Sequence, residues 1–243
     1  MKHLDRSALA LEIDRLTQSL GLRVTPQQAQ DMALHVARVL EANESFNLTS
    51  ITEPADAVRL LVVDSLTAMP EVDDAPAGNL VDIGAGAGFP GIPLAIVSGR
   101  HVRLVESVGK KTRFLEEVAG ELAVSASVSV SCARAEELAT IERECYAVAT
   151  ARALSGLPSL VELAAPLLFS GGRLVALKGA LTSEELGRGD SAASVVGLTR
   201  VAFRQLRLPE AGESRSIVVY ERTGASSIAL PRRVGLAQRK PLS

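Results

Sequence analysis

A glycine-rich loop is the segment of this sequence whose residue types are best suited to binding a ligand. It follows the apolar run Leu80–Ile83 and reads Gly84-Ala85-Gly86-Ala87-Gly88-Phe89-Pro90-Gly91. The glycines let the backbone turn tightly and approach a ligand without a Cβ in the way. A helical stretch follows, and its positive N-terminal end is expected to face the same crevice, at the carboxyl end of a sheet.

Two acidic side chains complete a pattern around this loop. Asp82 stands just before it, and Glu106 follows Gly88 by 18 residues, about one helix and one strand further along. A loop for a dinucleotide pyrophosphate reads G-x-G-x-x-G, but Phe89 takes the place of its last glycine, which disfavours a nicotinamide dehydrogenase. The pattern favours S-adenosylmethionine, whose ribose hydroxyls Glu106 is expected to bind. The alternative is a structural turn with a solvent-facing Glu106.

The acceptor of a methyl group is less clearly indicated. Neither Cys132 nor Cys145 follows a proline, as the nucleophile of pyrimidine-carbon methylases typically does. Residues 150–153 read Thr-Ala-Arg-Ala where adenine amino-group methylases usually carry an Asn- or Asp-Pro-Pro-aromatic loop. In-line displacement from a sulfonium depends largely on holding the two reactants in place. Guanine N7 has an in-plane lone pair and needs no base, so the sequence is compatible with N7 without selecting it.

No metal site or hydrolase site is indicated. The three histidines, His3, His35 and His101, are isolated from one another and are expected to be ordinary surface or helix residues. No serine stands in a nucleophile elbow. The two cysteines show neither ligand spacing nor a disulfide framework, and both are expected to be small buried or half-buried side chains.

Composition and charge are those of a globular protein. Of 243 residues, 47% are hydrophobic and 22% are charged. The charged N-terminus argues against a signal peptide, and no apolar run reaches the roughly 18 residues of a membrane span. A cytoplasmic location without membrane contact is therefore expected. The net charge of −2 conceals an asymmetry, since residues 1–78 hold 12 acidic and 6 basic side chains.

The C-terminal tail from Pro231 carries no acid and four cations, Arg232, Arg233, Arg239 and Lys240. Such a tail can bind phosphates or remain solvated. Together with Lys110, Lys111 and Arg113, it favours RNA over a small metabolite as substrate. Because it is far in sequence from every candidate cofactor contact, its charges are expected to leave cofactor affinity unchanged.

The elements that must position these residues fall into three segments. Residues 1–78 are predicted to form an N-terminal helical extension with one helix ending near Gly21, a second from the Thr25 cap to about Asn43, and a third from Pro54 through Leu66. Residues 73–78 are the best candidate linker. Residues 79–223 form the predicted S-adenosylmethionine-binding domain, and residues 224–243 form the basic tail.

Short apolar runs alternate with helical stretches after residue 79. Strands are expected at 80–83, 102–105, 128–131, 147–150 and 173–177. Helices are expected at 92–97, 110–122, 134–140 and 157–168. A last pair of strands, near 194–203 and 214–221, is expected to join through a turn near 210–212. Strands separated by helices need crossovers, so the fold class is α/β, a doubly wound, mostly parallel seven-stranded sheet of the Rossmann-like, class I methyltransferase type.

Several longer motifs extend over nearly the whole chain. They are Phe46–Ile51, Asp64–Leu66, the loop with its continuation Phe89–Pro93, Gly109–Leu115, Arg134–Glu137, Ala151–Ala153, Ala176–Gly179, Pro231–Gly235 and Lys240–Leu242. In these motifs the chain resembles the bacterial 16S ribosomal RNA guanine-N7 methyltransferase family, also known as the glucose-inhibited division protein B family. The resemblance implies methylation of guanine N7 in 16S ribosomal RNA, as free RNA or in the small subunit, at an unpaired base.

The resemblance and the loop together imply site residues. Cofactor contacts are expected at Gly84, Gly86, Gly88, Phe89, Glu106, Ala135, Glu136 and Arg152. Arg152 is also expected to position the reactants beside the site of transfer, the alternative being a structural ion pair with Glu106 or Glu136. RNA contacts are expected at Lys110, Lys111, Lys178, Arg232, Arg233, Arg239 and Lys240, although Lys178 is equally suited to capping its strand.

One departure from the family pattern concerns the substrate side. The family usually carries a Lys/Arg-His-x-x-Asp-Ser pattern, whereas Leu60 and Leu61 precede Asp64 here, with Arg59 one step earlier. The departure bears on the substrate rather than the cofactor and leaves a paralogue with another target open. The sequence is also compatible with a methyltransferase of the same fold that acts on a protein or a small molecule, and with a cofactor-binding module without catalysis.

Overall fold

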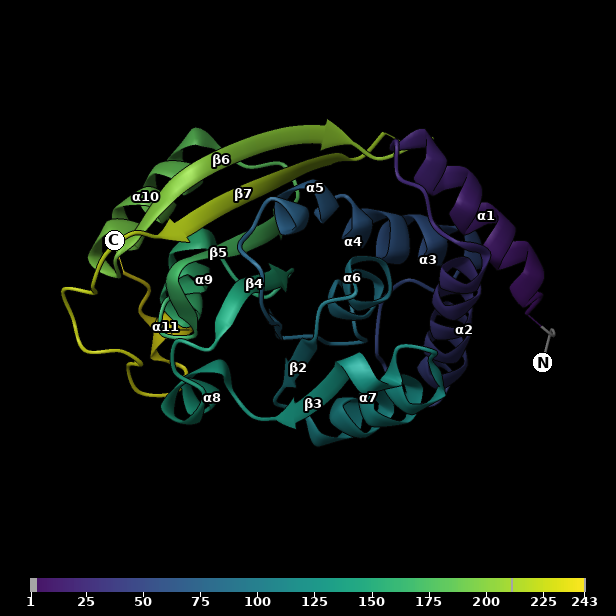
Figure 1. Cartoon of the computed structure of the whole chain (residues 1–243), viewed down its shortest axis with the longest axis horizontal. Helices are drawn as coiled ribbons and strands as arrows, with labels where there is room; N and C mark the ends of the chain where they lie inside the picture. Colours follow the sequence, from purple (N-terminus) through teal and green to yellow (C-terminus); the bar gives the residue numbers. More distant parts are fainter. Residues whose placement is uncertain (1–3, 211, 243) are drawn as a thin grey trace.

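A seven-stranded sheet in the order β3-β2-β1-β4-β5-β7-β6 forms the centre of the structure, a computed structural model that describes residues 4–210 and 212–242 (Figure 1). The strands are β1 (Leu80–Ile83), β2 (Val102–Glu106), β3 (Val128–Cys132), β4 (Tyr146–Arg152), β5 (Leu168–Lys178), β6 (Leu198–Arg207) and β7 (Ser214–Arg222). β1 to β5 pair in parallel, and β7 runs antiparallel to β5 and β6. The predicted mostly parallel, seven-stranded α/β sheet is confirmed.

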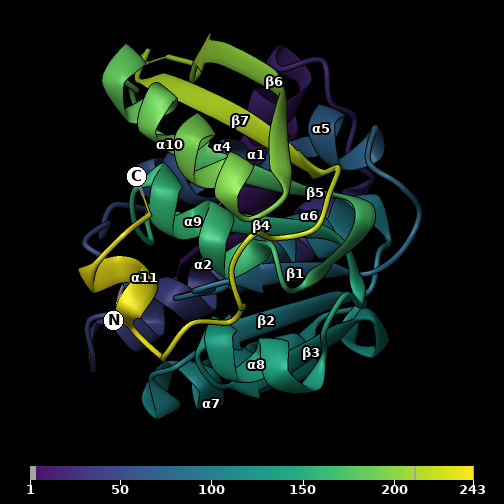
Figure 2. The same ribbon diagram turned by 90° about the vertical axis from the view of Figure 1, so that its left-hand side faces the viewer.

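Helices connect the parallel strands and cover both faces of the sheet (Figure 2). The connections are α6 (Gly91–Ser98), α7 (Gly109–Glu121) with the short 3₁₀ turn η2 (Ser125–Ser127), α8 (Ala135–Ile141), α9 (Leu157–Ala164) and, between β5 and β6, α10 (Ser183–Val195). Apolar side chains alternate along the strands. Leu80 packs with α6 and α7 on one face, and Val81 packs with α8 and α9 on the other.

The N-terminal helices share the first of these two apolar clusters. They are α1 (Arg6–Ser19), α2 (Pro26–Asn43), α3 (Pro54–Ala57), the π-helix η1 (Val58–Val63), α4 (Asp64–Leu66) and α5 (Met69–Asp73). The Thr25 cap is confirmed, because the Thr25 hydroxyl accepts from the Gln28 N–H while the Gln28 side chain accepts from the Thr25 N–H. Met32 and Val36 of α2 are fully buried in the same cluster as the β1 residue Leu80.

The candidate linker at residues 73–78 is fixed by one side chain. The Arg100 guanidinium donates to the carbonyls of Val72, Ala75, Pro76 and Gly78 at 2.7–3.0 Å. The described residues before and after this segment therefore pack together. The division of the chain at residues 78 and 223 stays a prediction.

The prediction was incomplete for several elements. The expected helix from Pro54 through Leu66 is present as one continuous helical stretch, with a π-helical turn at Val58–Val63, whereas α10 and α5 were not predicted. α10 contains two glycines and buries only Gly189, Ala192 and Ala193, so it carries little apolar periodicity. Of the last strand pair, β6 lies later than expected, at Leu198–Arg207, whereas β7 at Ser214–Arg222 is confirmed. Of the turn at 210–212, Ala211 lies outside the described residues, as does His3.

Both cysteines contradict expectation. Cys132 and Cys145 are exposed rather than buried: Cys132 is the last residue of the edge strand β3, and Cys145 precedes β4. Among residues 4–210 and 212–242, no helix is long and apolar enough to cross a membrane, and no group of His, Cys, Asp and Glu side chains is placed to hold a metal ion.

Candidate cofactor-binding site

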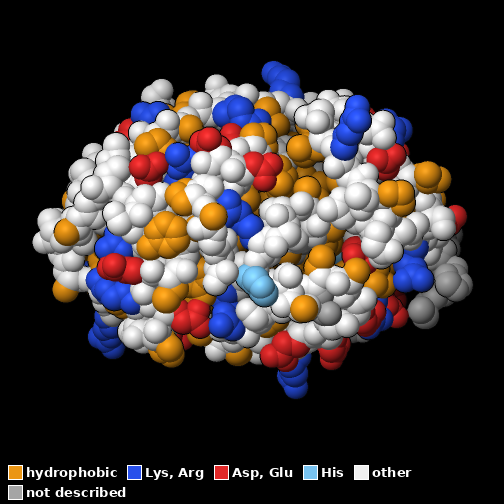
Figure 3. All heavy atoms as spheres, viewed as in Figure 1, with side chains coloured by type: hydrophobic (Ala, Val, Ile, Leu, Met, Phe, Trp, Pro, Cys, Tyr) orange, Lys and Arg blue, Asp and Glu red, His pale blue; other side chains and the backbone are white. Residues whose placement is uncertain are grey.

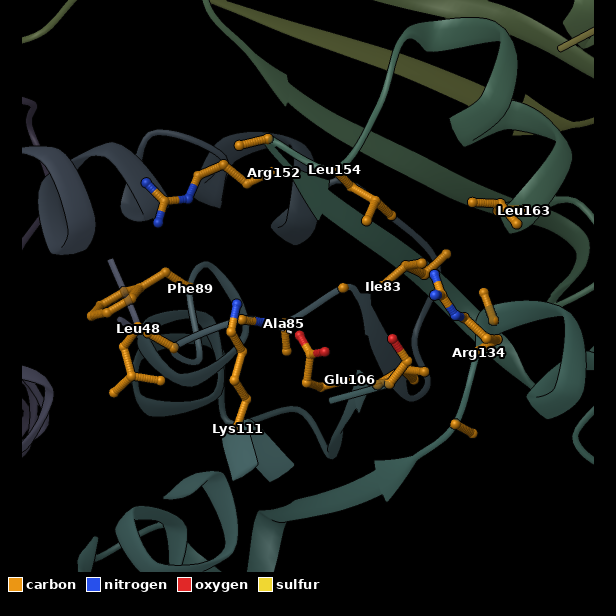
Figure 4. A pocket seen from close by; sticks show the side chains of 18 of the residues that line it. Leu48, Ile83, Ala85, Phe89, Glu106, Lys111, Arg134, Arg152, Leu154 and Leu163 are labelled. Carbon is orange, nitrogen blue, oxygen red and sulfur yellow. Dashed lines mark hydrogen bonds between the residues drawn. The ribbon is translucent and has the colours of Figure 1, made fainter. Parts of the chain in front are cut away.

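A pocket of about 370 Å³ opens at the carboxyl ends of β1, β2 and β4 (Figure 4). This is where an α/β sheet of this kind binds its ligand, and the volume suits a small cofactor. Its walls combine four parts of the chain: the glycine loop, the ends of β2 to β4, the N-terminal residues Leu48 and Leu61, and Gln238 of the tail. The predicted cofactor residues are thereby brought together, with Gly88 lying behind the loop rather than in the lining.

The three loop glycines all have positive φ, at +74° for Gly84, +58° for Gly86 and +94° for Gly88. A Cβ on Gly84 would lie 2.8 Å from Leu154 Cδ1, and one on Gly88 would lie 2.6 Å from Ile92 Cδ1. Both glycines therefore permit close packing inside the protein. Gly86 differs, since the nearest atom to its added Cβ is the Gly84 carbonyl oxygen at 3.9 Å. The backbone at Gly86 thus borders the open space of the pocket.

Asp82 supports the loop from behind. Its carboxylate is fully buried and accepts from the Gly91 N–H at 2.9 Å and from the Thr150 hydroxyl at 3.0 Å. Burial raises the pKa of Asp82 to about 6, against the lowering effect of these two hydrogen bonds. The acid expected before the loop is therefore present, but it fixes the start of α6 and does not line the pocket.

Glu106 lies in front of the loop, inside the pocket. Its Oε2 accepts from the Gly86 N–H at 3.1 Å, and its Oε1 accepts from the Val108 N–H at 2.8 Å. The residue is only 7% exposed, so the alternative of a solvent-facing Glu106 was wrong. A carboxylate has about four acceptor positions, and both oxygens of Glu106 keep capacity for further donors such as hydroxyls.

His35 holds the loop from the side of α2, a role that sequence reasoning missed. Its ring is fully buried, stacks on Phe89 with centroids 4.2 Å apart, and has Nε2 2.7 Å from the Ala87 carbonyl oxygen. Burial lowers the pKa of His35 to about 4, so the ring is neutral at pH 7 and Nε2–H donates to that carbonyl. His35 was expected to be an ordinary surface or helix histidine; only its place on the buried face of α2 signals otherwise.

Arg152 lies across the pocket mouth from the loop (Figure 4). Its Nη1 donates to the Leu60 carbonyl at 2.7 Å and lies 3.5 Å from Asp64 Oδ2, and its guanidinium carbon is 5.7 Å from the centroid of the Phe89 ring. The alternative of an ion pair with Glu106 or Glu136 was wrong, because the partner is Asp64. The π-helical turn η1 presents the Leu60 carbonyl to this arginine.

The C-terminal tail packs against the same site, which contradicts the expectation that it lies away from the cofactor residues. The Gly235 N–H donates to Glu136 Oε1 at 2.7 Å, and Gln238 lines the pocket. The Ala237 carbonyl accepts from Ser159, and Arg232 forms a two-pronged ion pair with the buried Glu162. In Figure 2 the tail, with its short helix α11 (Leu236–Arg239), runs past α9 and α8.

The predicted RNA-binding side chains divide into two groups. Those that are exposed or border the pocket are Lys110, Lys111, Arg233, Arg239 and Lys240. Lys178 and Arg232 are already engaged, Lys178 with Glu185 at 3.1 Å and the Ser155 carbonyl at 2.9 Å. Figure 3 shows Lys and Arg side chains interspersed with Asp and Glu on the face it presents, so that face carries no continuous basic patch.

Sequence comparison matches this chain to a known protein family. Residues 28–217 match the family described as rRNA small subunit methyltransferase G. The ribosomal RNA small subunit methyltransferase G of Synechococcus elongatus is 37% identical over 240 residues, which cover 97% of this chain and 99% of that protein. The protein of the same name from Deinococcus radiodurans is 39% identical over 227 residues, covering 92% and 88%.

The chain belongs to the rRNA small subunit methyltransferase G family. Solved structures agree on the fold alone. A geranyl diphosphate methyltransferase in complex with GPP and sinefungin has a TM-score of 0.57 at 15% identity, covering 82% of this chain and all of that one. The [4+2]-cyclase SpnF has a TM-score of 0.55 at 12% identity, covering 81% and 96%. The same fold therefore serves different reactions, so the activity of this chain is inferred from its family and not from its fold.

As a member of the rRNA small subunit methyltransferase G family, the chain is an enzyme that uses S-adenosylmethionine. The pocket fits this cofactor. Gly86 leaves its backbone open to a ligand, Glu106 offers buried carboxylate oxygens suited to ribose hydroxyls, and Phe89 and Leu48 supply apolar walls. When bound, the cofactor supplies an activated methyl group; Gly86, Glu106, Phe89 and Leu48 are the residues that would hold and shield it.

Proposed function

We propose that this chain methylates N7 of a guanine in the 16S RNA of the small ribosomal subunit, in the cytoplasm. The observation that carries the proposal is the match of residues 28–217 to the rRNA small subunit methyltransferase G family, and the described lining of the cofactor pocket is compatible with an acceptor that needs no base. The carboxylates that line the pocket, Glu106 and Glu136, both accept backbone N–H groups, and its other ionisable side chains are cations. Guanine N7 needs no deprotonation before it attacks, so positioning suffices.

Each predicted cofactor-binding residue has a place in this proposal. We assign the cofactor to Gly84, Gly86, Gly88, Phe89, Glu106, Ala135, Glu136 and Arg152, with Gly84, Gly88 and Glu136 acting through the shape they give the walls. Arg152 also borders a second cavity and so stands between cofactor and acceptor. Its guanidinium is fixed by Asp64, the Leu60 carbonyl and Phe89, which suits a positioning role.

RNA phosphates are assigned to the exposed cations. Lys110 and Lys111 lie at the start of α7 beside the pocket, while Arg233, Arg239 and Lys240 lie on the tail beyond it. Arg232 and Lys178 leave this group, because each already pairs with a carboxylate. The target base must be unpaired, since the N7 edge of an A-form helix lies in a groove too deep and narrow for a protein pocket.

The test uses S-adenosylmethionine carrying a labelled methyl group, with small ribosomal subunits and free 16S RNA as separate substrates. Borohydride reduction followed by aniline cleaves RNA at N7-methylguanine, and mass spectrometry of the nucleosides identifies the product independently. The expected result is that the wild type transfers the labelled methyl group to N7 of one guanine, and that Gly86→Val transfers none. Label in protein or in a small molecule, with none in RNA, would contradict the proposal and favour another acceptor class.

A further inference from the structure

A second cavity, of about 280 Å³, lies on the far side of Arg152 from the cofactor pocket. Its lining includes Leu60, Asp64, Arg152, Leu177, Lys178 and Arg215. Arg152 and Ala153 line both cavities, so the two are neighbours separated by one side chain. The volume lies just below the range of sites for drug-sized ligands, which suits a single flat ring system better than a whole nucleotide.

A buried carboxylate lies in the lining of this cavity. The Asp64 side chain is 6% exposed, and its Oδ1 accepts from Arg215 Nε at 2.8 Å while its Oδ2 lies 3.5 Å from Arg152 Nη1. These contacts use part of the roughly four acceptor positions of a carboxylate. The other N–H groups of Arg152, at Nε and Nη2, have no partner within residues 4–210 and 212–242. Asp64 and Arg152 thus offer the cavity an acceptor beside a donor.

The apolar part of the lining can hold the faces of a ring. Leu60 comes from the π-helical turn and Leu177 from the end of β5, and Ile51 lies in the same lining. A flat heterocycle placed among aliphatic side chains loses contact with water on its faces, while its edges meet the polar groups.

The order of these groups matches the edge of guanine. Around that ring stand, in succession, the 2-amino group and N1–H as donors, O6 as an acceptor, and N7. Across the structure stand, in succession, the Asp64 carboxylate, the Arg152 guanidinium and the cofactor pocket. Adenine would set an amino donor against the arginine and the N1 lone pair against the carboxylate, and both contacts are unfavourable.

We propose that this cavity receives the target guanine, with Asp64 accepting from N1–H and the 2-amino group and Arg152 donating to O6, so that N7 faces the cofactor pocket. Asp64 is then the residue that selects guanine, and Arg215 holds it in place. The proposal rests on the proposed function, because it names the subsite of that same reaction. A site built around a buried acceptor rejects a substrate that lacks the matching donor.

Inosine tests this directly, because it keeps N7, O6 and N1–H but lacks the 2-amino group. Small-subunit RNA joined from two pieces carries guanosine or inosine at the single position that the wild type methylates. For the wild type, kcat/KM on the inosine RNA is expected to be lower than on the guanosine RNA by a factor of about ten or more. The reason is that a hydrogen bond to a charged acceptor is lost. Asp64→Asn is expected to slow methylation of the guanosine RNA. It is also expected to reduce the ratio of kcat/KM for the guanosine RNA to kcat/KM for the inosine RNA below about twofold.

The matched control is Asp56→Asn, which removes the same charge from a neighbouring helix at a half-exposed position outside the cavity. It should keep the tenfold preference. Equal rates on both RNAs with the wild type, a measurement that needs no variant, would overturn the inference while leaving the proposed function intact. A tenfold preference that persists in Asp64→Asn would also overturn it. If the wild type methylates neither RNA at N7, the proposed function itself fails.

Discussion

Two of the walls of the cofactor pocket, one from the glycine loop and one from the C-terminal tail, are held in different ways. The loop wall, residues 84–89, is fixed from behind by fully buried polar groups: Asp82 accepts from Gly91 and Thr150, and His35 donates to Ala87 and stacks on Phe89. The tail wall, residues 231–242, is attached from outside by the Arg232–Glu162 ion pair and by single hydrogen bonds at Gly235 and Ala237.

Because the two walls are held differently, cofactor binding is expected to depend on them in different ways. The loop wall is part of the core, so its shape exists before any ligand arrives and changes to it act on binding directly. The tail wall contributes Gln238 to the pocket lining, and the Arg232–Glu162 pair is the one charged contact among its attachments described above. Changes to the tail should therefore lower cofactor affinity only partly, while the sheet stays folded.

The largest expected effect is at Gly86, where an added side chain enters the space of the ligand. Gly86→Val should abolish S-adenosylmethionine binding in calorimetry, at least a hundredfold loss of affinity, while cooperative unfolding is retained. Gly99→Val is the matched control, because Gly99 also has positive φ, at +67°, and open space around its added Cβ but lies at the end of α6. Equal affinity in the two variants would remove the loop wall from the site.

The next effect concerns the attachment of the tail wall. Arg232→Gln leaves Glu162, which is 3% exposed, as a buried charge without its partner, and breaking such a pair costs about 3–5 kcal/mol. Unfolding by denaturant should show a loss of that order, and cofactor affinity should fall severalfold because Gln238 is no longer held at the pocket. Arg233→Gln, its exposed neighbour, should change neither quantity. A neutral Arg232→Gln would mean that the tail is not attached through this pair.

The two buried supports of the loop wall should show opposite pH dependence. The folded-state pKa of His35 is lowered to about 4 from 6.5, so its contribution is fully present above pH 6.5 and is lost as pH falls toward 4. The folded-state pKa of Asp82 is raised to about 6 from 3.8, so folding is penalised progressively as pH rises from 4 to 6. Each amounts to about 3 kcal/mol, and in the wild type the two nearly cancel.

Single variants should uncover these opposed slopes. Relative to the wild type, His35→Gln should gain stability as pH falls from 6.5 to 4, and Asp82→Asn should gain stability as pH rises over 4 to 6. Denaturant unfolding across this range measures both. Parallel profiles for the wild type and both variants would show that neither group titrates differently on folding.

The smallest effect should come from the exposed cations of the tail wall. Replacing Arg233, Arg239 and Lys240 with Gln should flatten the dependence of log binding constant on log salt by about 2, at roughly 0.7 per single-strand phosphate. Cofactor affinity should stay unchanged, because Arg232 still holds the tail. An unaltered salt slope would place the RNA elsewhere on the molecule.

The sequence predicted the loop wall well and the tail wall poorly. β1, the loop and the acids Asp82 and Glu106 follow one another locally, so their glycines and strand period carry the information. The contacts of His35 with Ala87, of Arg152 with Asp64 and of Gly235 with Glu136 join residues 52, 88 and 99 positions apart. No local pattern encodes such pairings; a buried position on α2 was the only hint for His35.

Some helices were also missed because tertiary packing, and not the local sequence pattern, determines their residues. α10 is poor in large apolar residues because Gly189 lies against Leu157 and the Tyr220 hydroxyl, where a Cβ would clash at 2.7–2.8 Å. Packing thus selects a residue that local propensity disfavours in a helix. The π-helical turn at Val58–Val63 likewise has no sequence signature, although it presents the Leu60 carbonyl to Arg152.

Hydrogen–deuterium exchange of the full chain, with and without S-adenosylmethionine, tests most directly whether both walls enclose one cofactor site. The account predicts that the cofactor slows amide exchange in two separate segments at once, residues 84–88 of the loop wall and residues 235–238 of the tail wall. In Arg232→Gln, at saturating cofactor, protection should persist in the loop wall and diminish in the tail wall. Protection confined to either wall alone, or absent from both, in the wild type would contradict the account.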